Sequence, residues 1–192
     1  MRFLPVNISA AGLILWTGPR HSGKSRALAV LVDVLRMRGL QPAGFIAPSI
    51  WREGVLRGFD LLDVRTGRRS PLARRGQLGV EQVGSFQFAA AGLAAGRAAL
   101  APQSIGEADL VLVDEFGPLE MRGGGWRSTV DGLLGVVPTM LLLVVRRELV
   151  DAVMKMYEPH RPVLVRAADP EAVCRVLDVL RNSRGRLCNR VL

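Results

Sequence analysis

Apolar residues occur along this chain in short runs of strand length, separated by longer segments in which they recur every three or four positions. The runs predict strands at 13–17, 41–48, 84–88, 108–115, 139–145 and 162–166. The periodic segments predict helices at 26–38, 89–101, 126–134, 148–157 and 170–180. Because strands alternate with helices, we expect an α/β chain with a three-layer α/β/α fold, in which helices cover both faces of a mainly parallel central sheet.

The segment 51–76 interrupts this alternation. Two stretches of alternating residues flank a Thr66-Gly67 turn, which predicts an inserted β-hairpin. The segment carries seven arginines, namely Arg52, Arg57, Arg65, Arg68, Arg69, Arg74 and Arg75. A solvated hairpin and a cap with an arginine that reaches a bound phosphate both fit this pattern, and the sequence leaves the choice open.

The first predicted strand leads directly into a glycine-rich segment. Residues 18–25 match G-x-x-x-x-G-K-S, the phosphate-binding P-loop pattern. Two glycines let backbone N–H groups turn inward, and the following helix adds its own N–H groups and positive dipole end. We therefore expect a nucleoside triphosphate to bind here, at Gly18, Pro19, Arg20, His21, Ser22, Gly23, Lys24, Ser25 and Arg26.

Three side chains of this segment have separate expected tasks. Lys24 is placed to reach the β- and γ-phosphates, and the Ser25 hydroxyl is placed to bind Mg²⁺. His21 occupies a variable position of the pattern, where it either fills space or touches the γ-phosphate.

Four apolar residues at 110–113 precede two carboxylates, Asp114 and Glu115. The apolar run predicts a strand buried on both faces, and ligands of open α/β sheets bind at the carboxyl ends of the strands. Asp114 therefore fits a carboxylate that holds Mg²⁺ near Ser25. Glu115 fits a base that orients and deprotonates an attacking water. Acidic pairs also begin ordinary surface loops, but the phosphate loop upstream favours the catalytic interpretation.

The basic charge of the chain changes this picture little. The formal net charge is +9, and all basic residues except Lys24 and Lys155 are arginines. The arginines are scattered and aromatic residues make up only 5% of the chain, so no stripe suited to stacking on bases is visible. Nucleic acid is therefore disfavoured as the main partner. The densest basic segment, 181–192, is expected to be a solvated C-terminal tail.

Length and cysteine content suggest one domain in a reducing compartment. A chain of 192 residues with 49% hydrophobic residues fits a single domain, 1–192. Cys174 and Cys188 form no C-x-x-C pair and no metal-binding spacing, which favours a cytoplasmic location. The N-terminal residues lack signal-peptide features, and the longest apolar run is of strand length, so we expect no membrane association.

Several blocks of residues follow one another in a fixed order. The most specific is 114–120, which reads D-E-F-G-P-L-E, and the others are 18–25, 43–48, 57–61, 84–86 and the basic pair at 146–147. In these blocks the chain resembles the THEP-type nucleoside triphosphatases, also called cancer-related NTPases. The acidic block 114–120 is similar to the D-E-I-G-P-M-E sequence of that family. The resemblance extends over roughly residues 13–166, most of the chain.

This resemblance implies a P-loop fold that hydrolyses ATP, GTP and other nucleoside triphosphates with Mg²⁺ and with broad tolerance of the base. From their positions in the motifs, the resemblance implies that Lys24 and Ser25 contact phosphate and metal. It also implies that the Asp114 carboxylate binds Mg²⁺ and that Glu115 is the base.

The resemblance also implies that Glu120, Arg146 and Arg147 are near the site. The chain departs from the family at 49–51, where an acidic residue and an arginine usually follow the proline of the second strand. Its three glycines at 123–125 also form a looser segment than is usual in the family.

The leading prediction is an Mg²⁺-dependent nucleoside triphosphatase, with Lys24, Glu115, Arg146 and Arg147 as catalytic residues and NDP and phosphate as products. One alternative is a small-molecule kinase, for which the arginine-rich hairpin would be a lid that excludes water. Another is a nucleotide-gated adaptor, similar to the accessory GTPases of molybdopterin cofactor assembly, which would bind nucleotide tightly and turn it over little. The sequence identifies no protein partner.

Overall fold

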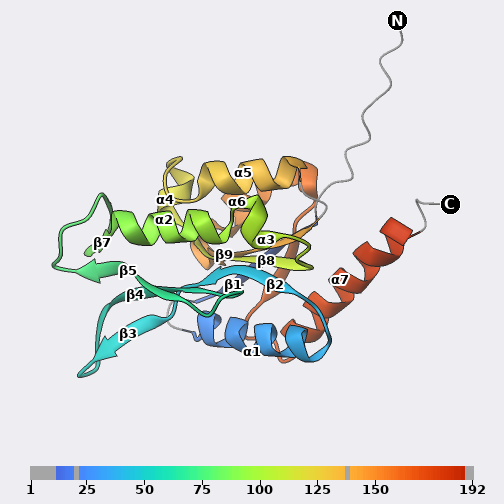
Figure 1. The fold of residues 1–192 in the computed structure, drawn as a ribbon, viewed down its shortest axis with the longest axis horizontal. Helices are drawn as coiled ribbons and strands as arrows, with labels where there is room; N and C mark the ends of the chain where they lie inside the picture. Colours follow the sequence, from blue (N-terminus) through green and yellow to red (C-terminus); the bar gives the residue numbers. More distant parts are fainter. Residues whose placement is uncertain (1–11, 20–21, 137–138, 189–192) are drawn as a thin grey trace, which may run out of the picture.

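The computed structural model of this protein describes residues 12–19, 22–136 and 139–188 (Figure 1). These residues form a sheet with the strand order β10-β1-β9-β8-β2-β4-β5-β7-β6, and β3 pairs with β4. The strands are β1 Leu13–Gly18, β2 Pro42–Ile46, β3 Ser49–Arg52, β4 Val55–Asp63, β5 Arg69–Arg75, β6 Glu81–Val83, β7 Phe86–Phe88, β8 Leu110–Phe116, β9 Met140–Arg146 and β10 Val163–Arg166. The helices are α1 Lys24–Met37, α2 Ala90–Ala99, α3 Pro102–Ile105, α4 Pro118–Met121, α5 Arg127–Val136, α6 Val150–Met156 and α7 Ala172–Cys188, with 3-10 helices η1 Arg147–Leu149 and η2 Glu158–His160.

Five strands make up the parallel part of the sheet. β10 pairs with β1, β1 with β9, β9 with β8 and β8 with β2, all in parallel. Their carboxyl ends therefore lie at one edge of the sheet, and the register places Gly18 beside Arg146. The predicted α/β architecture with a mainly parallel central sheet is confirmed.

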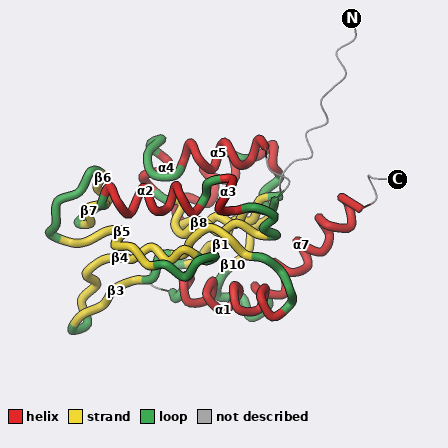
Figure 2. The backbone as a smooth tube through the Cα atoms, viewed as in Figure 1, coloured by secondary structure: helices red, strands yellow, loops and turns green. Residues whose placement is uncertain are grey.

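The apolar runs form strands that are buried on both faces, and helices cover each face of the sheet (Figure 2). On one face, the apolar sides of α1 and α7 pack on Ile14, Trp16 and neighbouring strand residues. On the other face, α2, α3, α5 and α6 pack on Leu15 and Val113 among others. Alternate residues of one strand thus serve two separate cores, which explains why these strands are apolar except near their carboxyl ends, where Thr17 and Asp114 are buried.

Helix α1 has the apolar face that its spacing predicts. Its buried residues are Leu28, Leu31, Val32 and Leu35. Gly39 closes the helix with φ of +71°, and the Leu40 N–H donates to the Leu35 carbonyl at 2.9 Å. A glycine in the left-handed conformation therefore ends this helix.

The antiparallel part of the sheet is larger than the predicted hairpin. The turn at 66–67 is present, with the Asp63 carboxylate accepting the N–H groups of Arg65 and Thr66 at 2.9 Å each. However, β3 extends the hairpin at its other end, and β7 and β6 continue the sheet beyond β5. Residues 81–83, for which the sequence predicts a loop and not a strand, form β6, which is held by main-chain pairing with β7 rather than by an apolar pattern of its own.

The last helix is also longer than predicted. α7 continues to Cys188, so residues 181–188 are helical and do not form a separate basic tail, while 189–192 lie outside the described residues. Arginine is a good helix former, so the basic composition of this segment does not end the helix. Within the described ranges, no helix combines the length and the hydropathy that a bilayer crossing requires.

Candidate active site

The phosphate-loop segment lies between β1 and α1. β1 is buried throughout and ends at Gly18, and α1 begins at Lys24. Gly23 has φ of +80°, and a Cβ built on it would meet no atom within 4 Å, so its glycine is needed for the backbone angle rather than for space. The predicted order of strand, loop and helix is confirmed, whereas Arg20 and His21 lie outside the described residues.

Inside the loop, two side chains bind backbone carbonyl groups. The Lys24 Nζ donates to the carbonyl oxygens of Pro19 at 2.8 Å and Gly18 at 3.2 Å. The Ser22 hydroxyl donates to the same Pro19 oxygen at 2.8 Å. Arg26 is exposed on the first turn of α1. The ammonium group of Lys24 therefore lies at the carboxyl edge of the sheet, where the P-loop pattern predicts a positive charge.

The acidic strand end meets the loop at Ser25. The Ser25 hydroxyl donates to Asp114 Oδ2 at 2.7 Å, although the two residues are 89 positions apart in the sequence. The Ala47 N–H donates to the same oxygen at 3.0 Å, so the chain just after β2 completes the cluster. The structure thus brings together the two predicted metal-binding residues. It adds a backbone group, at Ala47, that no sequence pattern marks.

Burial dominates the electrostatics of Asp114, which is 3% exposed. Burial raises the pKa of Asp114 to about 6, while the Ala47 N–H, the Ser25 hydroxyl and the Lys24 charge act in the opposite direction. A carboxylate that has lost its water in this way is stabilised by a cation at short range. A hydroxyl and a carboxylate are oxygen ligands of the kind that Mg²⁺ uses together with phosphate oxygens, so these residues fit magnesium.

The second carboxylate, Glu115, is held by Arg146. The Arg146 Nε donates to Glu115 Oε1 at 2.5 Å, and both side chains are partly buried. Because Arg146 lies opposite Gly18 in the register, this ion pair is at the same edge as the phosphate loop. Arg147 begins η1 and is exposed, and among the described residues no hydrogen bond or ion pair joins it to the loop, Asp114 or Glu115.

Glu120 directs its carboxylate into its own loop. Oε2 accepts the Gly117 N–H at 2.7 Å, and Oε1 accepts the Trp126 N–H at 3.2 Å. Burial raises the pKa of Glu120 to about 7, although both N–H groups lower it. Its hydrogen bonds are therefore with the segment that follows Glu115 and not with the phosphate loop.

Three arginines of the predicted hairpin make contacts outside the phosphate loop. Arg74 pairs with Asp60 at 2.5 Å, Arg65 donates to the Ser104 carbonyl at 2.7 Å, and Arg75 lies over the ring of a neighbouring phenylalanine. These contacts favour a structural role for Arg65 and Arg74. The cap hypothesis stays a prediction for the other arginines.

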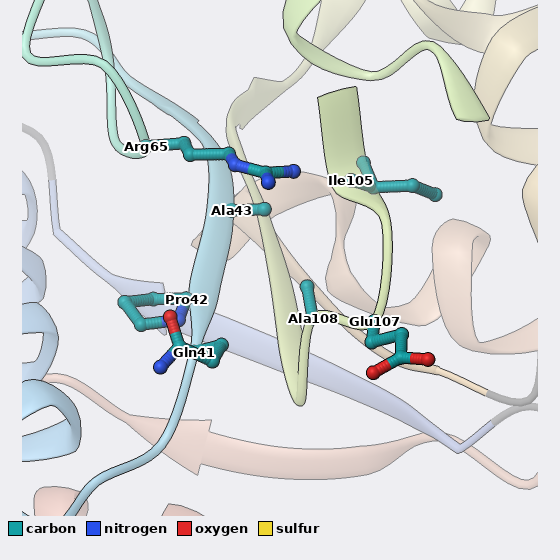
Figure 3. A pocket seen from close by; sticks show the side chains of 7 residues that line it. All are labelled: Gln41, Pro42, Ala43, Arg65, Ile105, Glu107 and Ala108. Atoms are coloured by element: carbon teal, nitrogen blue, oxygen red, sulfur yellow. The ribbon is translucent and has the colours of Figure 1, made fainter. Parts of the chain in front are cut away.

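A cavity of about 210 Å³ lies at the opposite edge of the sheet, where β2 and β8 begin (Figure 3). Its lining residues are Gln41, Pro42, Ala43, Arg65, Ile105, Glu107 and Ala108. It contains none of the predicted site residues. The predicted residues Ser25, Asp114 and Glu115 lie at the carboxyl edge of the sheet instead.

A phosphate loop between a buried strand and a helix, with its serine bonded to an aspartate at the end of a parallel strand, defines a P-loop nucleotide-binding protein. A family model described as NTPase matches residues 13–192. The nucleoside-triphosphatase THEP1 of Methanothermobacter thermautotrophicus is 32% identical over 183 residues, which cover 90% of this chain and 98% of that protein. The chain belongs to the THEP1 family of nucleoside triphosphatases, as the acidic block and the phosphate loop indicated.

Further relatives agree with this assignment. The nucleoside-triphosphatase THEP1 of Thermofilum pendens is 30% identical over 139 residues, covering 72% of this chain and 76% of that protein. The solution structure of a human cancer-related nucleoside triphosphatase has the same fold, with a TM-score of 0.68 and 20% identity over 91% of this chain and 98% of that chain. The crystal structure of THEP1 from Aquifex aeolicus also has a TM-score of 0.68, with 17% identity over 87% of this chain and 98% of that chain.

Proposed function

We propose that this nucleoside triphosphatase binds the triphosphate of ATP or GTP on residues 18–26 and hydrolyses it with Glu115 as the general base. The hydrogen bond between Ser25 and Asp114 carries this proposal. It fixes the phosphate loop against the strand end from which Glu115 projects, so the phosphates and the base would meet at one edge of the sheet.

Magnesium would be held by Ser25 and Asp114, both of which offer oxygen ligands. When bound, Mg²⁺ supplies positive charge to the β- and γ-phosphate oxygens. The Ala47 N–H keeps the Asp114 carboxylate oriented toward Ser25. Lys24, which lies over Pro19, would exchange its carbonyl partners for phosphate oxygens.

In the proposed reaction, the oxygen of a water molecule attacks the γ-phosphorus and the bond to the β–γ bridging oxygen breaks. Glu115 takes a proton from the water, and the products are NDP and inorganic phosphate. Arg146 keeps the Glu115 carboxylate in place, and its remaining N–H groups are donors for the γ-phosphate. Arg147, which is exposed, would add positive charge from a greater distance.

We extend the proposal to nucleoside triphosphates with different bases. The residues assigned here would contact phosphates and metal, which all nucleoside triphosphates share. Similar rates of phosphate release from ATP, GTP, CTP and UTP support this extension, whereas release from a single nucleotide contradicts it.

Substitution of Glu115 by glutamine tests the base assignment. We expect phosphate release to fall about 100-fold or more, because the amide cannot accept the proton. The affinity for a fluorescent ATP analogue should change less than about threefold, since the phosphate contacts remain. Glu107→Gln, at the opposite edge of the sheet, is the matched control for loss of a carboxylate. Unchanged phosphate release by Glu115→Gln would remove Glu115 from the mechanism.

A further inference from the structure

Glu120 is a buried carboxylate to which the proposed hydrolysis gives no role. It is 2% exposed, and within the described residues no ion pair with a basic side chain involves it. Instead, its two oxygens accept N–H groups from the two ends of the segment 117–126. The carboxylate therefore closes this segment into a loop.

One end of the loop is anchored in the core at Trp126. This indole is 2% exposed, its ring centroid lies 4.8 Å from that of Phe45, and a Cβ on Gly96 would come within 2.2 Å of it. Three glycines precede Trp126, and a Cβ on Gly125 would lie only 2.0 Å from Glu120 Oε1. The chain thus wraps closely around the carboxylate, which ties the rest of the loop to the anchored end.

The other end of the loop touches Glu115. A Cβ on Gly117 would lie 2.7 Å from Glu115 Oε1, so the Glu115 carboxylate lies directly against the Gly117 backbone. Arg146 bonds the same oxygen at 2.5 Å. The position of the Glu115 carboxylate is therefore defined by the guanidinium of Arg146 and the backbone of Gly117, and Glu120 bonds that backbone directly.

The contacts explain why a carboxylate occupies this position. Each oxygen of Glu120 accepts one N–H group, whereas a glutamine has only one acceptor oxygen and would turn its NH₂ group toward the other N–H. Burial disfavours the charged form and raises the pKa of Glu120 to about 7, and the two N–H groups offset part of this cost.

We infer that Glu120 is a positioning residue for hydrolysis, which fixes Gly117 and through it the Glu115 carboxylate, without touching the nucleotide. The inference rests on the proposed role of Glu115 as the base. Removing the hydrogen bonds of Glu120 to Gly117 and Trp126 should displace Glu115, while the phosphate loop keeps its contacts.

A double-mutant cycle between Glu120 and Glu115 tests this coupling. In the wild-type background, we expect Glu120→Gln to lower kcat for phosphate release by about 10- to 100-fold, because small displacements of a catalytic group have effects of this size. KM for ATP and the affinity for a fluorescent ATP analogue should change less than about twofold. In the Glu115→Gln background, Glu120→Gln should lower kcat no further, since no base is left to position.

The cycle separates the inference from the proposed function. Equal losses in both backgrounds would show that Glu120 acts independently of Glu115 and would overturn the inference, while the base assignment stands. If Glu115→Gln alone leaves kcat unchanged, the base assignment fails, and the inference fails with it.

A second variant keeps the inference testable if Glu120→Gln unfolds. Gly117 has a negative φ of −134°, so alanine there avoids the cost of a left-handed backbone, and Gly117→Ala should press its methyl group against the Glu115 carboxylate. We expect the same selective loss of kcat, with thermal unfolding as a check on the fold and Glu107→Gln as the control. An unchanged kcat in Gly117→Ala would overturn the inference.

Discussion

The two halves of the candidate site are built in different ways. The phosphate loop is one contiguous segment, and the hydrogen bonds of Lys24 and Ser22 stay within it. The acidic half, 114–126, depends on partners from distant parts of the chain, since Asp114 bonds Ser25 and Ala47, and Glu115 bonds Arg146. The first half thus rests mainly on local contacts and is linked to the second by the Ser25–Asp114 bond, whereas the second half exists only when the sheet is assembled.

This difference predicts different consequences of substitution. Side chains of the phosphate loop are exposed or half-buried, so changing them should affect nucleotide binding and leave the stability of the fold nearly unchanged. Asp114 and Glu120 are buried, so changes in the acidic half should affect both turnover and the free energy of unfolding.

Lys24→Ala is expected to have the largest effect. Loss of a preorganised cation at the phosphates should lower kcat/KM by about 100- to 1,000-fold, while the thermal unfolding midpoint stays nearly constant. Phosphate release and nucleotide affinity measure the first effect, and thermal denaturation measures the second. Lys155→Ala is the matched control, because Lys155 is the other lysine of the chain and is exposed on α6. A large drop in stability on loss of Lys24 would contradict the local character of this half.

The pair Arg146 and Arg147 tests the acidic half. Arg146 holds Glu115, so Arg146→Ala should lower kcat by about 100-fold through misplacement of the base. Arg147→Ala should lower kcat by less than about threefold, because its charge is exposed and screened. Steady-state phosphate release with both variants measures the difference. A larger loss for Arg147 would exchange the roles of the two arginines.

This pair also shows what sequence could and could not predict. The strand before the arginines was predicted from its apolar run, but two adjacent residues at a strand end take different directions, and only the structure shows that Arg146 reaches Glu115. By contrast, the proximity of Ser25 and Asp114 could be predicted from the sequence, because parallel strands share a carboxyl edge. The Ala47 N–H could not be predicted in the same way, because a backbone donor has no residue type of its own.

Glu120 illustrates a further limit. The family resemblance placed it near the site, and its separation from Glu115 in the sequence is small. Its hydrogen bonds to Gly117 and Trp126 depend on the path of a glycine-rich loop, which apolar periodicity does not describe. β6 was missed for a related reason, because its position is set by pairing with β7.

The buried carboxyl of Glu120 should make stability depend on pH. Its pKa is raised from 4.5 to about 7, so between these values the folded state binds more protons than the unfolded state, and stability falls as pH rises. This contribution is fully present below pH 4.5 and is lost as pH passes 7. Because glutamine does not titrate, Glu120→Gln should remove this decline in the free energy of unfolding, which a shift from 4.5 to about 7 sets at about 3 kcal/mol.

Urea denaturation at a series of pH values measures the decline. Glu115 faces Glu120 and raises its pKa, and Asp114 has a raised pKa of its own, but both remain in the variant, so the difference between the two proteins isolates Glu120. Parallel pH profiles of wild type and Glu120→Gln would show that Glu120 does not titrate in this range.

The smallest expected effect is the loss of stability when one glycine from each half is replaced by alanine. Gly23 and Gly125 both have positive φ, but a Cβ on Gly23 meets no atom within 4 Å, whereas a Cβ on Gly125 would lie 2.0 Å from Glu120 Oε1. Gly23→Ala should therefore cost about 1 kcal/mol from backbone strain alone. Gly125→Ala should cost about 1 kcal/mol more, because the buried carboxylate must move and weaken its bonds to backbone N–H groups. Urea denaturation of both variants measures the difference. Equal costs would mean that the carboxylate adjusts freely, and the acidic half would then be as tolerant of local change as the phosphate loop.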